Sequence, residues 1–324
     1  MDFPITHPLH IKNNHPLSII KNKIYSLFPE FSKHDDLLPF TSVEQNFDKL
    51  LIPHDHDSRK QNNTYYINNN HVLRTHTSAH QNLLLLNGET KFLVTGDVYR
   101  RDTVDRFHYP VFHQMEGVKV CDNALEDLDS SIVNIINTLF PNCDFRKVDS
   151  YFPFTVNSCE WEIYFNDRWV EVLGCGVIHP TICKNYNISS GWAFGLGLER
   201  LAMILFDIPD IRLFWTDDER FNQFKEGEIT KFKPYSNQPV CYKDIAFWIP
   251  DDYDFNRFCE VARNLGSNLI ESIDEIDTFE KDGKTSKCYR ISYRDWSRSL
   301  TNEEINELQD KIRTRVTEMG CVVR

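Results

Sequence analysis

The amino-acid sequence predicts an α+β protein of two domains: an antiparallel-sheet domain over residues 1–206 and a ferredoxin-like βαββαβ domain over 239–324, joined by a linker over 207–238. Three observations lead to this prediction. The length of 324 residues suits two domains of about 150 residues each. The β-like segments of the first domain cluster together without regular alternation with helices, which favours an antiparallel sheet. The C-terminal segments follow the order strand, helix, strand, strand, helix, strand.

The elements of the first domain follow from hydrophobic periodicity. Leu17, Ile20 and Ile24 recur at helical spacing, and the segments that alternate or concentrate branched and aromatic residues are typical of strands. Asn166 and Asp167 form the expected turn of a hairpin. The predicted helices are 16–28, 124–140 and 198–206, and the predicted strands are 92–99, 111–120, 161–165, 169–173 and 191–197.

The second domain has a clearer pattern. Thr301 and Glu304 have the spacing of a capping box at the start of its last helix, and Gly320 suits the end of that helix. The predicted order is a strand over 244–249, a helix over 254–265, strands over 269–278 and 287–293, a helix over 303–319 and a strand over 321–323.

Composition excludes several classes of protein. The 48 acidic and 36 basic residues give a net charge of −12, which argues against coating nucleic acid or an anionic membrane by bulk charge. No apolar run approaches the roughly 20 residues of a membrane-spanning helix. The nine cysteines include no C-x-x-C pair, which favours reduced thiols. The opening residues show neither a secretory signal nor an organellar presequence.

Two polar segments of the first domain are candidates for binding a small ligand. In the extended segment 73–81, His76 and Ser78 point the same way, although such a pair is more often a turn or cap. In the strand 111–120, Phe112, Gln114 and Glu116 share one face. A ring, an amide and a carboxylate in a row suit an aromatic surface and an ammonium group; the alternative is a half-exposed strand.

Two aromatic segments are further candidates. Phe152 and Phe154 share a face and form a wall for an aromatic ligand, or, by the default interpretation, pack in the core. In 191–200, glycines alternate with bulky residues before Arg200, which lets a ligand approach the backbone. The sequence has no P-loop motif, and the late glycine segment lacks G-x-G-x-x-G.

Basic and aromatic residues alternate near the C-terminus. Six Lys or Arg residues lie between positions 281 and 298 with only two acidic residues, interleaved with Tyr289, Tyr293 and Trp296. This composition suits single-stranded RNA, in which cations contact phosphates and rings stack on bases. A solvated strand whose rings pack inward is the alternative, and composition alone favours it.

Taken together, these segments resemble the class II aminoacyl-tRNA synthetases, and within them the phenylalanyl-tRNA synthetases of the single-chain mitochondrial type. Residues 96–117 resemble the family's motif 2 and residues 191–200 its motif 3. Residues 228–324 resemble the ferredoxin-fold anticodon-binding domain of such enzymes. Further family landmarks lie at 45–59, 74–78, 152–154 and 171–176.

The resemblance implies the activation of L-phenylalanine with ATP and its transfer to phenylalanine tRNA, on a class II antiparallel-sheet catalytic domain. Arg100, His108 and Arg200 are the implied catalytic residues, and ATP would contact these three and Phe112. The implied phenylalanine site consists of His76, Ser78, Gln81, Gln114, Glu116, Phe152, Phe154 and Ala193. Glu171 is the candidate for contact with Mg²⁺, and the candidates for tRNA binding are Lys287, Arg290, Arg294 and Arg298.

The resemblance also favours a monomer in the mitochondrial matrix, with no membrane partner. Two alternatives stay open on the sequence. One is a synthetase-like enzyme that adenylates a small acid without charging tRNA, and the other is a non-catalytic RNA-binding protein that has kept the scaffold. The C-terminal domain argues against the first, and the presence of Arg100, Gln114, Glu116 and Arg200 argues against the second.

Overall fold

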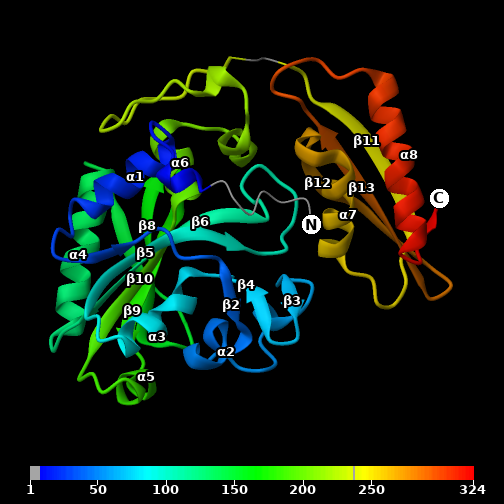
Figure 1. Cartoon of the computed structure of the whole chain (residues 1–324). Helices are drawn as coiled ribbons and strands as arrows, with labels where there is room; N and C mark the ends of the chain where they lie inside the picture. The colour runs from blue at the N-terminus through cyan, green and yellow to red at the C-terminus, as the bar shows by residue number, and fades with distance from the viewer. Residues whose placement is uncertain (1–7, 236–237) are drawn as a thin grey trace.

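The computed structural model describes residues 8–235 and 238–324 (Figure 1). Residues 1–7, on which the expectation about a signal or presequence falls, and residues 236–237 of the predicted linker lie outside the described residues. No helix among the described residues combines the length and the apolar character needed to cross a bilayer.

A seven-stranded sheet forms the centre of the first domain, in the order β1-β5-β6-β10-β9-β8-β7. Only the pairing of β1 with β5 is parallel among these neighbours, so the predicted antiparallel sheet is confirmed. The strands are β1 (Ser32–His34), β5 (Lys91–Tyr99), β6 (Val111–Val120), β7 (Phe145–Asp149), β8 (Thr155–Phe165), β9 (Arg168–Ile178) and β10 (Gly191–Gly197).

Helices cover one face of this sheet and leave part of the other face to a cavity. Trp192 and Phe194 of β10 pack with the apolar stripes of three helices, while Ala193 between them faces the opposite side. The covering helices are α1 (Pro16–Tyr25), α4 (Ala124–Leu139) and α6 (Leu198–Phe206). On the opposite side lie α2 (Val43–Asn46), α3 (Gln81–Leu86), α5 (Pro180–Asn185) and a small sheet, β2-β4-β3, of Phe40–Ser42, His71–Leu73 and Tyr66–Asn68 (Figure 1).

The long elements of the first domain match the sequence predictions, with one difference. Asn166 and Asp167 have φ of 49° and 61°, the left-handed values of the predicted two-residue turn. Strands β8 and β9 extend farther than predicted, to Thr155 and Ile178, because they pair with each other beyond the segment rich in β-forming residues. Polar residues such as Asn157 and Ser158 therefore lie in a strand that their own propensities do not favour.

The segment that follows α6 packs on the first domain. It contains short 3₁₀ helices over Ile211–Trp215 and Glu219–Phe221. Phe221, Phe224 and Phe232 are buried in the same core as α1 and α6. Much of the segment predicted as a linker thus contributes apolar surface to the first domain.

The second domain has the predicted βαββαβ order, and its sheet runs β12-β13-β11-β14. Helices α7 and α8 pack on one face, where Phe258, Tyr289 and Ile312 are fully buried. The capping box of Thr301 and Glu304 is present, so that prediction is confirmed. The elements are β11 (Cys241–Trp248), α7 (Phe255–Gly266), β12 (Ile270–Lys281), β13 (Lys284–Tyr293), α8 (Asn302–Glu318) and β14 (Val322–Val323).

The loop between β5 and β6 lies between the two domains. Val104 of this loop is buried in the core of the second domain, and its carbonyl accepts a hydrogen bond from the amide of Ile273 at 3.0 Å. Arg101 forms an ion pair with Glu260 of α7 at 2.6 Å. The second domain therefore fixes the loop that carries much of predicted motif 2.

The capping box generates a prediction about stability. In Thr301→Ala, the amide of Glu304 loses its acceptor at the start of α8, and we expect unfolding to require about 1 kcal/mol less. Urea denaturation followed by circular dichroism measures this change. Thr301→Ser keeps the hydroxyl and serves as the control; an equal loss in both variants would contradict the capping role.

Candidate active site

A cavity with a volume of about 640 Å³ opens on the uncovered face of the seven-stranded sheet. It collects residues from β6, β9, β10, the segment before α3 and the segment before β8. Gln81 is buried but is not among the residues that line it. The other predicted phenylalanine residues all line it, namely His76, Ser78, Gln114, Glu116, Phe152, Phe154 and Ala193.

A second cavity of about 270 Å³ adjoins the first. Arg100, Gln114 and Glu171 line both cavities, which places the two side by side. His108, Phe112 and Arg200, the other predicted ATP residues, line the second one. The two motif arginines thus open onto one continuous hollow.

One end of the larger cavity is aromatic. The rings of Phe152 and Phe154 stack with their centroids 6.1 Å apart, and both residues are half-buried. A Cβ added to Gly174 would lie 2.7 Å from the ring of Phe152, so only glycine leaves room for that ring. Ala193 adds a small apolar side chain to the lining. This end is a slot for a flat apolar group.

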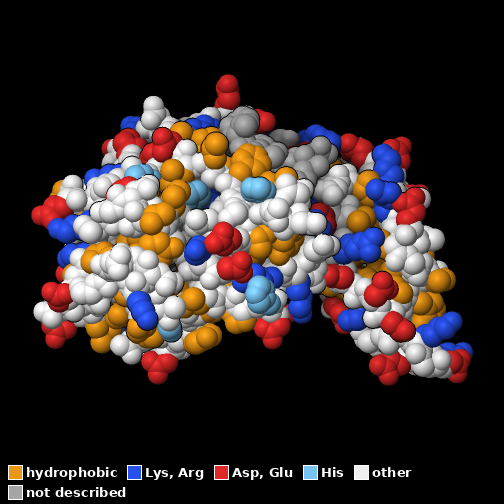
Figure 2. Space-filling model, turned by 60° about the horizontal axis from the view of Figure 1, so that its bottom comes forward, with side chains coloured by type: hydrophobic (Ala, Val, Ile, Leu, Met, Phe, Trp, Pro, Cys, Tyr) orange, Lys and Arg blue, Asp and Glu red, His pale blue; other side chains and the backbone are white. Residues whose placement is uncertain are grey.

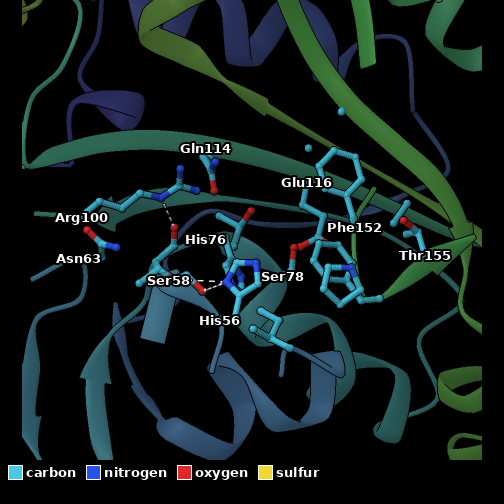
Figure 3. Close-up of a pocket in the computed structure, with 18 of the residues that line it drawn as sticks. His56, Ser58, Asn63, His76, Ser78, Arg100, Gln114, Glu116, Phe152 and Thr155 are labelled. Carbon is cyan, nitrogen blue, oxygen red and sulfur yellow. Dashed lines mark hydrogen bonds between the residues drawn. The ribbon is translucent and has the colours of Figure 1, made fainter. Parts of the chain in front are cut away.

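The other end is polar. Figure 3 shows Arg100, Gln114, Glu116 and Phe152 in a row across the cavity, with Ser78 beside Glu116. Burial raises the pKa of Glu116 to about 8, while a hydrogen bond from Ser78 opposes this shift. Burial and the nearby charge of Arg100 lower the pKa of His76 to about 3, so the ring of His76 is neutral at neutral pH.

Several buried polar atoms at this end have no hydrogen-bond partner among the described residues. They are both amide atoms of Gln81, Oε2 of Glu116 and a ring nitrogen of His76. Each such atom costs roughly 1–3 kcal/mol of stability when it stays unpaired. A polar ligand that donates to the carboxylate would remove part of this cost, so these atoms fit a site for a polar ligand.

Arg100 is held at the junction of the two cavities. Its Nε donates to the carbonyl oxygen of Thr75 at 2.9 Å, and its guanidinium lies 5.1 Å from the ring centroid of Phe112. Burial lowers the pKa of Arg100, and the carboxylates of Asp102 and Glu171 oppose this shift. The terminal nitrogens are the groups through which an arginine grips phosphate oxygens.

Arg200 and Glu171 face each other in the smaller cavity. Arg200 Nη1 lies 2.8 Å from Glu171 Oε2, and both side chains are half-exposed. Mg²⁺ in nucleotide sites takes one or two carboxylates together with phosphates and water. Glu171 and Asp102 line the same hollow, so the carboxylates present fit this ion, whereas no cluster of three or more metal-ligating residues occurs in the described part of the chain.

His108 lies at the mouth of the smaller cavity and is exposed. Its Nδ1 lies 2.6 Å from a carboxylate oxygen of Asp105, and this hydrogen bond raises the pKa of His108. The ring therefore carries positive charge over a wider pH range, which suits contact with phosphate.

The four basic residues predicted for tRNA binding are all paired with carboxylates. Their partners are Glu275 for Lys287, Asp244 for Arg290, Glu271 for Arg294, and both Asp295 and Glu304 for Arg298. The rings of Tyr289 and Tyr293 are fully buried, so the inward-packing alternative describes these two. Figure 2 agrees with the pairing of the basic residues, since acidic and basic side chains are interspersed over the surface of the second domain.

The sheet of the second domain carries an aromatic and basic cluster that sequence reasoning missed. On the face opposite α7 and α8, Trp248 lies 6.1 Å from Phe279 between ring centroids. The guanidinium of Arg324 lies 5.4 Å from each of these rings. These three residues are distant in sequence, and only the order of the strands brings them together.

The rim of the larger cavity also includes residues that were not predicted for the site. His56 and Ser58 lie on it, with 2.8 Å between Nδ1 and the hydroxyl (Figure 3). Asn256 of the second domain reaches it and donates to Asn63 at 3.3 Å. The family landmark at 45–59 was the available signal for His56 and Ser58.

Comparisons with known proteins agree with this geometry. The family described as "tRNA synthetases class II core domain (F)" matches residues 2–224, and the family described as "Ferredoxin-fold anticodon binding domain" matches residues 236–324. The chain belongs to the class II aminoacyl-tRNA synthetases. The predicted fold class, a class II core followed by a ferredoxin-fold domain, is therefore confirmed.

Curated relatives narrow the family further. "Phenylalanine--tRNA ligase, chloroplastic/mitochondrial" of Arabidopsis thaliana is 52% identical over 95% of this chain and 77% of its own length. "Phenylalanine--tRNA ligase, mitochondrial" of Dictyostelium discoideum is 44% identical over 95% of this chain and 84% of its own. The protein of that name from Saccharomyces cerevisiae is 35% identical over 94% and 86%. Membership of the phenylalanine–tRNA ligases is thus shown, as the sequence motifs predicted.

The raised pKa of Glu116 generates a prediction about the pH dependence of stability. The unfolded carboxyl ionises near its ordinary value of 4.5, whereas the folded one holds its proton to about pH 8. The contribution of Glu116 to folding stability therefore falls as pH rises through this window. In Glu116→Gln we expect this fall to shrink by a few kcal/mol.

Urea denaturation of both proteins at about pH 5 and about pH 8 measures the difference. Glu303→Gln, at an exposed position at the start of α8, is the matched control and should keep the wild-type pH dependence. If Glu116→Gln also kept the wild-type pH dependence, Glu116 would not be the buried acid that causes the fall in stability.

Proposed function

We propose that the chain activates L-phenylalanine with ATP to phenylalanyl-adenylate and transfers the amino acid to phenylalanine tRNA for organellar protein synthesis. The observation that carries the proposal is one continuous hollow with an aromatic slot at one end, unpaired buried polar atoms in the middle and two arginines at the other end. An amino acid with a phenyl side chain matches the first two parts, and a nucleoside triphosphate matches the third.

The phenylalanine site follows from this match. The phenyl ring packs against the wall that Phe152 and Phe154 form, with its edge toward Ala193. The ammonium group lies near Glu116, whose ionised form it stabilises, and Gln114 and His76 contact the polar end. Gln81 does not line the cavity, and both polar atoms of its amide have no partner among the described residues, so the amide is available to contact the polar end of bound phenylalanine.

The ATP site occupies the smaller cavity. Adenine lies between Phe112 and Arg200, and the phosphates extend toward His108 and Arg100. Mg²⁺ would bind to Glu171 and to phosphate oxygens and would neutralise developing charge on them. For the ion to bind, Glu171 exchanges part of its present contact with Arg200.

The first step requires no protein nucleophile. A carboxylate oxygen of phenylalanine attacks the α-phosphorus of ATP, the bond to the bridging oxygen breaks, and pyrophosphate leaves. Arg100 stabilises the charge that accumulates on the phosphorus oxygens and holds the two reactants in line. Its burial at the cavity junction makes this interaction stronger than it would be in water.

In the second step, a ribose hydroxyl of the terminal adenosine of the tRNA attacks the carbonyl carbon of the adenylate, and AMP leaves. The rest of the tRNA is bound by the second domain. We assign its unpaired bases to the cluster of Trp248, Phe279 and Arg324. Aromatic rings stack on bases, and a guanidinium beside them pairs with phosphate. Lys287, Arg290, Arg294 and Arg298 contribute to tRNA binding by exchanging carboxylate partners for phosphates.

The proposal extends to location and assembly. We infer that the protein acts in the mitochondrial matrix, where organellar tRNAs are charged, and that it acts as a monomer. The mitochondrial names of the relatives support the location.

The role of Arg100 is tested by phenylalanine-dependent exchange of pyrophosphate into ATP. We expect Arg100→Ala to abolish exchange and Arg100→Lys to reduce it by about 10²-fold, because lysine keeps the charge but loses the bidentate grip. Arg146→Ala, an exposed arginine on β7, is the matched control. Normal exchange in Arg100→Ala would remove the phosphate role; silence of the wild-type chain would instead favour a non-catalytic RNA-binding protein.

The tRNA surface is tested separately. We expect Trp248→Ala with Phe279→Ala to raise the KM for tRNA in aminoacylation by about tenfold or more, since each lost base stack costs about 1–3 kcal/mol. Pyrophosphate exchange, which involves no tRNA, should stay at the wild-type rate. Tyr164→Ala, an exposed ring on β8, is the control. Unchanged KM for tRNA in the double variant would exclude this face.

A further inference from the structure

Glu199 and His113 form a buried pair that connects helix α6 to strand β6. Oε1 of Glu199 lies 2.7 Å from Nδ1 of His113, and Oε2 accepts the backbone N–H of His113 at 2.8 Å. The side chains are 3% and 0% exposed. Both oxygens of the Glu199 carboxylate thus contact His113, one at its backbone and one at its ring. The two contacts fix both the position of β6 against α6 and the orientation of the ring.

The neighbours of this pair in the sequence are the two groups proposed to hold adenine. Phe112 precedes His113 on β6, and Arg200 follows Glu199 on α6. Because successive side chains of a strand point to opposite faces, Phe112 faces the cavity while His113 faces the core. The two hydrogen bonds connect the two elements that carry Phe112 and Arg200 into the smaller cavity.

The surroundings of His113 keep the ring from tilting. The ring of His10 lies 5.1 Å away and that of Trp215 5.7 Å away, between centroids. Trp215 stacks in turn on Tyr109, which lines the same smaller cavity. Since Nε2 of His113 has no hydrogen-bond partner among the described residues, Glu199 supplies the polar contact that orients the ring.

We propose that Glu199 and His113 are positioning residues that set the separation of Phe112 and Arg200 and thereby the affinity for the adenine of ATP. This inference rests on the proposed function, because it takes Phe112 and Arg200 as the two sides of the adenine site. The pair acts through these neighbours, so its loss affects ATP more than phenylalanine, whose slot lies at the far end of the hollow.

The test is pyrophosphate exchange with ATP and phenylalanine varied in turn. We expect Glu199→Ala to raise the KM for ATP about tenfold or more, because small misplacements of binding groups have effects of this size, with the KM for phenylalanine within about twofold of wild type. Glu199→Gln keeps an acceptor for the backbone N–H of His113 and should recover most of the affinity for ATP.

A second pair of variants tests the other partner. His113→Asn keeps a donor near the position of Nδ1, and His113→Phe removes it; we expect the KM for ATP to rise more in the second. Gln309→Ala removes a buried acceptor of the second domain, which accepts from Tyr293 at 2.6 Å, and is the control for a general loss of stability. It should leave both KM values unchanged.

The outcomes distinguish a failure of the positioning role of Glu199 and His113 from a failure of the proposed ATP site. If Glu199→Ala leaves the KM for ATP unchanged, or raises the KM values for both substrates equally, while Arg200→Ala raises the KM for ATP, the positioning role is wrong and the proposed ATP site stands. If Phe112→Ala and Arg200→Ala both leave the KM for ATP unchanged, the proposed ATP site itself fails.

Discussion

The antiparallel pairing of β6 with β5 and β10 is the constraint on which the rest of the structure depends. Its register places Glu116 opposite Gly195, and the alternation of the two strands sends Met115 and Phe194 into the core and Gln114 toward the cavity. A shift of one residue would exchange the two faces, burying carboxylate and amide beneath the helices. The apolar core under α1, α4 and α6 therefore specifies the register, and the register specifies the site.

The same arrangement has a cost in stability. Glu116 and Gln81 occupy buried positions and His76 a half-buried one, where apolar side chains would stabilise the fold more, and some of their polar atoms have no partner in the described structure. Glu116 remains protonated at neutral pH because burial disfavours its charge. A cationic group in the cavity reverses this preference. A ligand that places a positive charge beside Glu116 therefore recovers part of the free energy that its burial costs in folding.

Sequence patterns identified the long elements because those features are local, and the family resemblance supplied the predicted residues that line the two cavities. The alternation in 111–120 and 191–197 predicted both the strands and the side that faces the cavity. Features that depend on partners distant in sequence could not be predicted from local patterns. For Tyr289 and Tyr293, composition favoured inward packing over an RNA surface but could not decide it, because the core they join is completed by α7 and α8. Arg290 meets Asp244 only because β13 pairs with β11. The three-residue strands β1 to β4 have too few residues to show a period.

The loop between β5 and β6 explains how one segment serves two domains. Its ends are fixed by the pairing of Tyr99 with Val111, its middle is held by Val104 in the second core, and Arg101 is paired with Glu260. Between these fixed points lie Arg100 and His108, which line the smaller cavity. Because the loop is anchored from both domains, the second domain supplies part of the preorganisation that the proposed phosphate contacts of Arg100 and His108 require. The contacts that dock the second domain thus also hold the proposed nucleotide site in place.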